Sequence, residues 1–255
     1  MVVSPPRADR LAVARERAAA SRKPAAGTPA YLRHVNRPAG AVVARYAFVG
    51  GRTPNQLTAA GAVVAGLGLA AVLVSVRWPW ASTLGGALLL GAYVLDSADG
   101  QLARLRGGGS AAGEWLDHVV DVAKSSAVHA VAVVVVLTHG PTLPAGWGAV
   151  PLVAGAVSAT GFFAFVLRDQ LLRGRPAGPS VPLGGRWHAV GTLLHDHALV
   201  CLVLATAGWA QLFIAVYTAH TVASAAVLTR ALRRAYRDLH RSASPPPDRC
   251  TRSQS

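Results

Sequence analysis

Charged residues are scarce in this 255-residue sequence, in which only 14% of the positions are Asp, Glu, Lys or Arg and 52% are hydrophobic. A soluble domain ordinarily has about 25% charged residues, and the mean hydropathy of +0.38 is correspondingly high. There are only two cysteines, Cys201 in an apolar run and Cys250 in a tail rich in proline and serine. This usage indicates neither a disulfide framework nor a cysteine metal site. The composition is that of an integral membrane protein.

An apolar core typical of a cleavable signal is also missing from roughly the first 35 residues, so membrane insertion should depend on internal segments. Acidic residues number 11 against 25 basic ones, which gives a formal net charge of +14. The arginines flank apolar runs and do not form a continuous patch with interleaved aromatic residues, which argues against nucleic acid as a partner. Basic residues in these places are typical of a protein held against an anionic membrane leaflet.

The order of polar and apolar segments predicts an all-α polytopic membrane protein with six transmembrane helices and a short N-terminal interfacial helix. We expect a basic cytoplasmic tail over residues 1–38, a membrane domain over 39–238 and a disordered tail over 239–255. Ala39–Val49 is too short to span the bilayer and is interpreted as the interfacial helix. The segments long enough to cross about 30 Å of hydrocarbon are Leu57–Val76, Ala81–Leu102, Trp115–Leu137, Trp147–Leu167, Trp187–Ala207 and Trp209–Leu232.

Polar residues interrupt the fifth of these segments at His195, Asp196 and His197. Two histidines that are two residues apart project to nearly opposite sides of a helix. We therefore expect a helix end or a re-entrant turn at this point rather than a metal site.

The arginines predict the orientation of the spans. They are concentrated between the second and third segments, between the fourth and fifth, and after the sixth, whereas the opposite loops contain little beyond Arg77. Basic loops tend to stay in the cytoplasm. Both termini, and any site between the second and third segments, should therefore face the cytoplasm.

Four aspartates occupy the facing ends of the second and third segments. Asp96 and Asp99 are three residues apart, and Asp117 and Asp121 are four apart. Each spacing places its pair on one face of a helix. Three glycines at 107–109 allow the chain to reverse between the helices, so we expect all four carboxylates to converge.

Carboxylates crowded at membrane depth repel one another, and each costs several kcal/mol unless cations neutralise it. Oxygen ligands without a nearby cysteine favour Mg²⁺ or Mn²⁺, and four acids are enough to hold two ions that clamp a phosphate. Gly100, Ala103 and Gly113 have almost no side chain and would let a bulky ligand approach the helix backbones. The guanidinium of Arg104 suits phosphate oxygens. This combination predicts a pocket for a metal-bound pyrophosphate.

The complete pattern is Asp-x-x-Asp-Gly-x-x-Ala-Arg, then eight residues, then Gly-x-x-x-Asp-x-x-x-Asp, and it resembles the signature of the CDP-alcohol phosphatidyltransferase family. The residues that match it in type and spacing are Asp96, Asp99, Gly100, Ala103, Arg104, Gly113, Asp117 and Asp121. The six-span architecture and the segment at 53–58 are also similar to this family, the latter to the entry into its first helix.

The resemblance implies transfer of a phosphatidyl or related phospho-alcohol group from a CDP-linked lipid, usually CDP-diacylglycerol, to a hydroxyl acceptor, with release of CMP, in phospholipid biosynthesis. It implies that Asp96, Asp99 and Asp117 hold the metal ions. Asp121 would lie near the same ions and act as the base that takes the proton of the acceptor hydroxyl. The residues implied to border the nucleotide and its phosphates are Gly100, Ala103, Arg104, Gly113, Asn55 and Thr58. Homodimers are also implied.

Two other function classes compete with this interpretation. A divalent-cation transporter or channel would use the acids as a selectivity site. That function leaves the small residues of the motif without a purpose and places a fixed cation, Arg104, beside the ion path. A catalytically silent family member is the other alternative, and the intact set of acids argues against it. Asn55 and Thr58 could also be only a helix cap and a packing residue.

The acceptor is not specified by these residues, since glycerol phosphate, inositol phosphate and uncharged alcohols all agree with the signature. Four arginines expected on the cytoplasmic side satisfy the positive-inside rule, and they also favour a phosphorylated polyol. They are Arg168, Arg173, Arg175 and Arg186.

Two further residues lie near the acids in the sequence. Lys124, one turn beyond Asp121, either balances the charge of the acids or contacts substrate. His118 follows Asp117 directly, so it should point about 100° away from that residue and pack against other side chains rather than bind metal.

Overall fold

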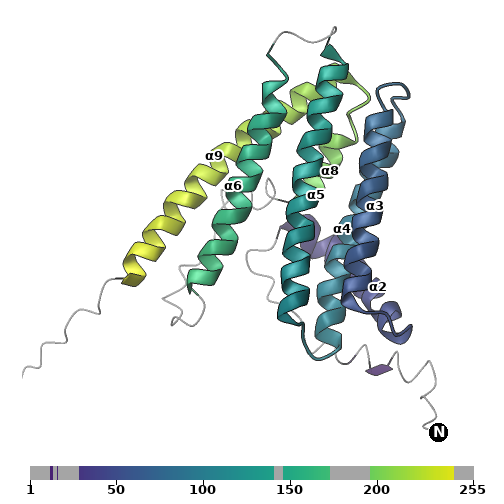
Figure 1. Cartoon of the computed structure of the whole chain (residues 1–255), viewed down its shortest axis with the longest axis vertical. Coiled ribbons are helices and arrows are strands. Elements are labelled where there is room, and N and C mark those ends of the chain that lie inside the picture. Colours follow the sequence, from purple (N-terminus) through teal and green to yellow (C-terminus); the bar gives the residue numbers. More distant parts are fainter. Residues whose placement is uncertain (1–11, 14–15, 17–28, 141–145, 173–195, 244–255) are drawn as a thin grey trace, which may run out of the picture.

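The computed structural model describes residues 12–13, 16, 29–140, 146–172 and 196–243, and all the regular elements in these residues are helices. They are η1 (Leu32–Asn36, a π-helical turn), α2 (Arg37–Val49), α3 (Pro54–Val74), α4 (Ala81–Leu105), α5 (Ala111–Thr138), α6 (Ala149–Leu172), α8 (His197–Leu204) and α9 (Ala210–Ala243). In Figure 1, α3 packs against both α4 and α5, while α6 and α9 form a pair that slopes away towards the lower left. The predicted all-α class is confirmed.

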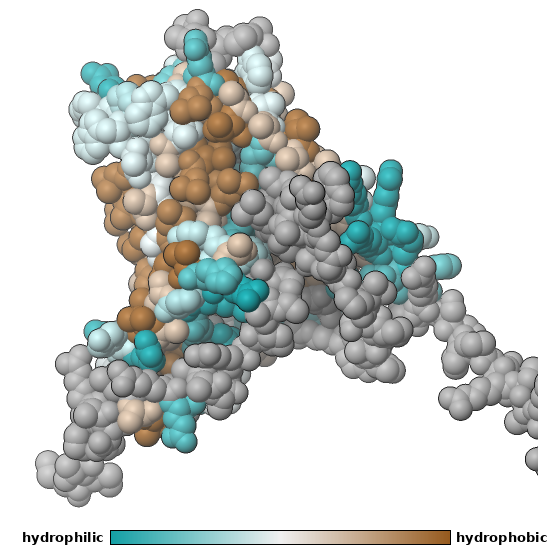
Figure 2. Space-filling view, turned by 180° about the vertical axis from the view of Figure 1, so that it is seen from behind, coloured by the Kyte–Doolittle hydropathy of each residue, from teal (hydrophilic) through white to brown (hydrophobic). Residues whose placement is uncertain are grey.

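Five of these helices, α3, α4, α5, α6 and α9, are long and apolar enough to cross a membrane. Large apolar side chains cover their outer surfaces, and Leu67, Phe163 and Val222 are each more than half exposed, at 58%, 67% and 64%. Figure 2 shows hydrophobic residues over much of the upper and middle parts of one face of the molecule. An apolar surface of this extent is typical of contact with lipid. Five of the six predicted spans thus correspond to helices in the described residues.

Residues 187–195 of the predicted fifth span, Trp187–Ala207, lie outside the described residues, and its described part, 196–207, contains α8. Eight residues of helix extend about 12 Å and do not cross a bilayer alone. The backbone N–H of Ala198 donates to Asp196 Oδ1 at 3.2 Å, so Asp196 caps the start of α8. Its other oxygen accepts from the N–H of Leu32 at 3.2 Å, which ties η1 to α8. A helix end was expected here, and in the described residues α8 begins at His197.

The short N-terminal helix is also confirmed, although α2 begins at Arg37, two residues earlier than predicted. This helix lies close against α4. Gln101 Nε2 of α4 donates a hydrogen bond to the carbonyl of Arg37 at 3.0 Å. A Cβ placed on Gly40 would lie only 2.9 Å from the same Nε2 atom. The buried Asn36 donates to the carbonyl of Tyr93 at 3.0 Å. These contacts fix α2 beside the half of α4 that carries the acidic motif.

Two hydrophobic clusters hold the helices together. The larger cluster joins α3, α4, α5, α6, α8 and α9. The smaller one joins α2, α3 and α4 beside the motif, and its buried members are Ala44, Leu57, Ala98, Leu102 and Leu105. The predicted tails lie mostly outside the described residues, and α9 continues to Ala243, beyond the predicted domain limit at 238.

Candidate active site

Local sequence signals place the motif-bearing ends of three helices at one end of the molecule. The turn after α4 contains Gly107 and Gly108, whose φ angles of 98° and 131° are strained for residues with a side chain. Ser110 then caps α5, accepting a hydrogen bond from the N–H of Gly113 at 3.0 Å. Thr53 starts α3 with a reciprocal capping box. These helix termini determine how many turns from its helix end each functional side chain lies.

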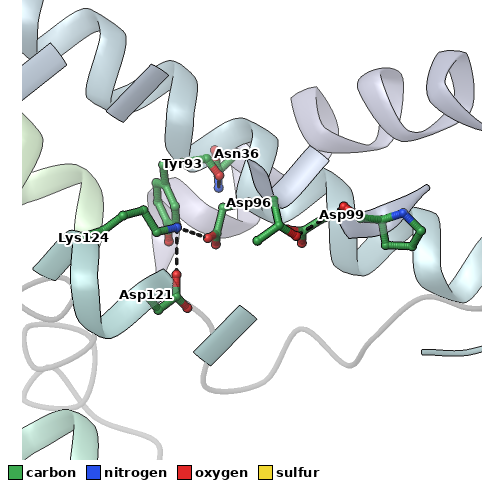
Figure 3. A network of polar contacts seen from close by, with 8 residues as sticks. Asn36, Tyr93, Asp96, Asp99, Asp121 and Lys124 are labelled. Carbon is green, nitrogen blue, oxygen red and sulfur yellow. Dashed lines mark hydrogen bonds and ion pairs between the residues drawn. The ribbon is translucent and has the colours of Figure 1, made fainter. Parts of the chain in front are cut away.

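Asp96 of α4 and Asp121 of α5 approach a common centre, as their spacing predicted. Figure 3 shows the Lys124 ammonium between them. Lys124 Nζ lies 2.7 Å from Asp121 Oδ1 and also forms an ion pair with Asp96. The Lys124 side chain is 16% exposed, against 23% for Asp96 and 31% for Asp121. One cation therefore neutralises acids from two helices in a largely desolvated place.

Asp117, His118 and Asp121 form a second group along α5, in which the candidate ligand atoms all lie within 4.8 Å of one another. The His118 ring packs edge-on to Phe162 of α6 with the centroids 6.0 Å apart, as expected, but the same ring also belongs to this possible metal-binding group. Its proximity to Asp121 was missed. The signal was available, since residues three apart on a helix lie on the same face.

Asp99 lies to one side of the group around Lys124 (Figure 3) and contacts α3 instead. It is buried and accepts a hydrogen bond from the Thr58 hydroxyl at 2.6 Å. Asp99 also lies within electrostatic range of Asp96 and Asp117. The four acids thus belong to one charged region, in which Thr58 holds the most buried of them. Thr58 was predicted to border the nucleotide or to pack, and its contact with a carboxylate had no signal in the sequence.

Replacing Thr58 with valine should lower the thermal unfolding temperature of the detergent-solubilised protein. Valine has a similar shape but no donor, and a buried acceptor that loses its partner costs about 1–3 kcal/mol. Thr58→Ser keeps the hydroxyl and serves as the control. Equal unfolding temperatures for the valine and serine variants would show that this hydrogen bond contributes nothing to stability.

The small residues of the motif border open space or a neighbouring helix. A Cβ added to Gly100 would meet only Arg104 Nη1, at 3.6 Å. A Cβ added to Gly113 would lie 3.4 Å from Asn55 Oδ1, which places Asn55 of α3 beside the start of α5. Ala103 and Arg104 are half-buried on α4. The packing of the chain therefore does not explain the glycine at position 100, whereas it does limit the space at 113.

Two arginines make contacts that join parts of the fold. Arg106 Nη2 donates to the carbonyl of Arg52 at 2.6 Å, which joins the α4–α5 turn to the loop before α3. Arg168 of α6 forms an ion pair with Asp238 of α9 at 3.6 Å. The other arginines proposed for a phosphorylated acceptor, at positions 173, 175 and 186, lie outside the described residues.

A cavity of about 410 Å³ adjoins the acids and extends between α3, α4, α5, α6, α8 and α9. Asp96, Asp121 and Lys124 line one part of it. Its other polar lining residues are Tyr93, Ser125, His129, Ser158, His197, His220, Thr221 and Ser224. The sequence did not predict this cavity, because its lining comes from six helices and no spacing along one helix relates them.

Comparisons with known proteins agree with the motif. The family model described as CDP-alcohol phosphatidyltransferase matches residues 52–223, which include every residue of the motif. Among solved structures, the chain is similar to the phosphatidylinositol phosphate synthase of Mycobacterium tuberculosis in a crystal structure with CDP-DAG bound. The TM-score is 0.56 at 20% identity, over 79% of this chain and 94% of that one, a similarity that supports the fold. A search of curated proteins found no match. Since the family match covers well over half of the sequence, this chain belongs to the CDP-alcohol phosphatidyltransferase family of membrane enzymes.

Proposed function

We propose that the enzyme transfers a phosphatidyl or related phospho-alcohol group from a CDP-linked lipid, such as CDP-diacylglycerol, to a hydroxyl acceptor, in phospholipid biosynthesis. The observation that supports this most is the meeting of Asp96 and Asp121, from two helices, around one cation. The similar structure from Mycobacterium tuberculosis has CDP-DAG bound, which supports the choice of donor.

The chemistry of the donor set fits divalent metal ions. A cation already lies between Asp96 and Asp121, in the form of an ammonium. Carboxylate oxygens, with one imidazole close by, form a set that Mg²⁺ or Mn²⁺ accepts. We assign two ions to the four acids Asp96, Asp99, Asp117 and Asp121. When bound, such ions neutralise charge on the diphosphate and hold it in place.

In the proposed reaction, the acceptor oxygen forms a bond to the lipid-linked phosphorus while the bond from that phosphorus to the bridging oxygen breaks. CMP leaves with the bridging oxygen. Asp121 takes the proton of the acceptor hydroxyl, and Arg104 binds phosphate oxygens. Gly100, Ala103, Gly113 and Asn55 border the nucleotide. Because most of the acceleration in phosphoryl transfer comes from positioning and electrostatics, the helices that fix these groups supply the main contribution of the protein.

A phosphorylated polyol, such as glycerol phosphate or inositol phosphate, is the proposed acceptor. The support for it is the arginine-rich sequence from Arg168 to Arg186. The positive-inside pattern likewise supports a cytoplasmic position for the site and both termini. The family resemblance supports a homodimer.

The purified protein in detergent micelles with CDP-diacylglycerol should release CMP when Mg²⁺ or Mn²⁺ and the correct acceptor are present, and EDTA should stop the release. Glycerol phosphate, inositol phosphate and uncharged alcohols would be compared, with the lipid products identified by mass. Metal-independent CMP release, or no CMP release with any acceptor, would contradict the proposal.

Gly100→Val should leave the protein folded but raise the KM for the CDP-linked lipid about tenfold or more, because added methyl groups in a filled site cost about 1–3 kcal/mol. A Cβ at position 100 would meet only Arg104 Nη1 within 4 Å, outside the backbone of its own helix. Gly91→Val is the matched control, since Gly91 lies on the same helix and an added Cβ there meets nothing within 4 Å. Equal KM values for the two variants would remove Gly100 from the donor site.

A further inference from the structure

Lys124 is outside the motif, yet its ammonium contacts two of the four motif acids. Its partners lie on different helices, Asp96 on α4 and Asp121 on α5. The positive charge of Lys124 offsets the repulsion between these acids, so α4 and α5 can present them to each other. Two carboxylates that face each other at low exposure are unstable together unless a cation separates them.

The ammonium occupies the place that a metal ion bridging the same two acids would need. Its nitrogen is 2.7 Å from Asp121 Oδ1, whereas Mg²⁺ binds carboxylate oxygens at about 2.0–2.1 Å. An ion and an ammonium cannot both lie within such distances of the same oxygens, because they repel each other and compete for the same lone pairs. Binding of an ion there therefore requires the lysine to move.

The displaced ammonium of Lys124 can enter the cavity beside the acids. Lys124 itself lines this cavity, with Ser125, Ser158 and His197 among the neighbouring lining residues. The four-carbon stem of lysine is flexible, and hydroxyl oxygens accept hydrogen bonds from an ammonium. A displaced Lys124 can thus stay within the protein and near polar groups.

We propose that Lys124 is a built-in counter-ion for one of the two metal positions, and that a divalent cation entering between Asp96 and Asp121 displaces its ammonium into the cavity. This inference rests on the proposed function. Asp99 is held by Thr58 and not by Lys124, so the two positions differ. The ion next to Asp99 binds without this competition, and the ion next to Asp121 binds more weakly because it must replace an ion pair.

Lys124 acts through the two acids and the metal position between them, which makes it a positioning residue.

The wild-type chain allows a direct test, because Lys23 and Lys124 are its only lysines. Reductive methylation with formaldehyde and a borohydride reagent, read by mass spectrometry, would report the reactivity of each amine with and without Mg²⁺. We expect labelling of Lys124 relative to Lys23 to change several-fold when Mg²⁺ is added, because the amine leaves its ion pair and enters the cavity. Unchanged relative labelling of Lys124 at saturating Mg²⁺ would overturn the proposal.

The Lys124→Met variant tests the same competition through metal affinity, measured by the electron paramagnetic resonance signal of free Mn²⁺ without lipid. The weaker Mn²⁺ site should bind at least about tenfold more tightly in this variant, a usual size of effect for groups that contact metal ligands. In EDTA the variant should unfold at a lower temperature than wild type, since its acids lose their cation. A purely structural lysine predicts the opposite sign for affinity, so weaker or unchanged Mn²⁺ binding would overturn the proposal.

Two controls accompany this variant. Lys124→Arg keeps the positive charge and should bind Mn²⁺ like the wild type. Arg77→Met removes a charge from an exposed position outside the site and should leave Mn²⁺ affinity unchanged. The labelling experiment needs no variant and decides the matter even if Lys124→Met does not fold. If CMP release depends on metal but the labelling of Lys124 does not change with Mg²⁺, this inference alone is wrong. If no CMP is released, the proposed function is wrong.

Discussion

Asp121→Asn should release CMP from CDP-diacylglycerol about 10²- to 10⁴-fold more slowly than the wild type, because general bases contribute about that much to a rate. Asparagine has nearly the same shape, but it cannot take the proton of the acceptor hydroxyl and is a poorer ligand for a divalent ion. Lys124 keeps its second partner, Asp96, in the variant. We therefore expect the variant to fold. The measurement is the rate of CMP release at saturating Mg²⁺ and donor.

Glu16→Gln is the matched control for this variant. Glu16 is exposed and lies far from the motif in the sequence. It should turn over like the wild type, and both variants should show cooperative thermal unfolding. Unchanged turnover in Asp121→Asn would remove Asp121 from the proposed role. Equal loss in both variants would mean that the assay reports a general sensitivity to lost acidic charge.

The approach of Asp96 to Asp121 was predictable because both parts of the argument were local. Spacings of three and four residues place side chains on one helix face, and glycines at 107 and 108 with positive φ return the chain. The same local rule also placed Lys124 on the face of Asp121. What it could not tell is that the ammonium reaches across to Asp96, since that depends on the distance between two helices.

Contacts between segments far apart in the sequence were beyond the reach of these rules. Thr58 and Asp99 are 41 residues apart and belong to different helices. Their pairing depends on the distance between α3 and α4. No periodicity within either helix encodes that distance. The fifth segment shows the opposite case. There the polar residues at 195–197 indicated a helix end, and in the described residues α8 begins at His197 with Asp196 as its cap.

The closeness of α3 and α4 is set by glycines. A Cβ on Gly85 would lie 2.7 Å from both the carbonyl oxygen of Gly68 and Val72 Cγ2. Contacts below 3.0 Å cannot persist, and one of the neighbouring atoms belongs to the backbone of α3, so the helices themselves would have to separate. The two helices run side by side in Figure 1 and carry Thr58 and Asp99 near their other ends.

Gly85→Ala should therefore destabilise the protein by about 1–3 kcal/mol, the usual cost of overpacking a well-packed interior. It should also weaken Mn²⁺ binding, because separating α3 from α4 pulls the Thr58 hydroxyl away from Asp99. Gly91→Ala on the same helix is the control, since its added Cβ meets nothing within 4 Å and alanine favours helix by up to about 1 kcal/mol over glycine. Thermal unfolding in detergent should consequently rank Gly91→Ala at or above the wild type and Gly85→Ala below it. Equal unfolding temperatures for the two alanine variants would mean that α3 and α4 are not held at the distance that brings Thr58 to Asp99.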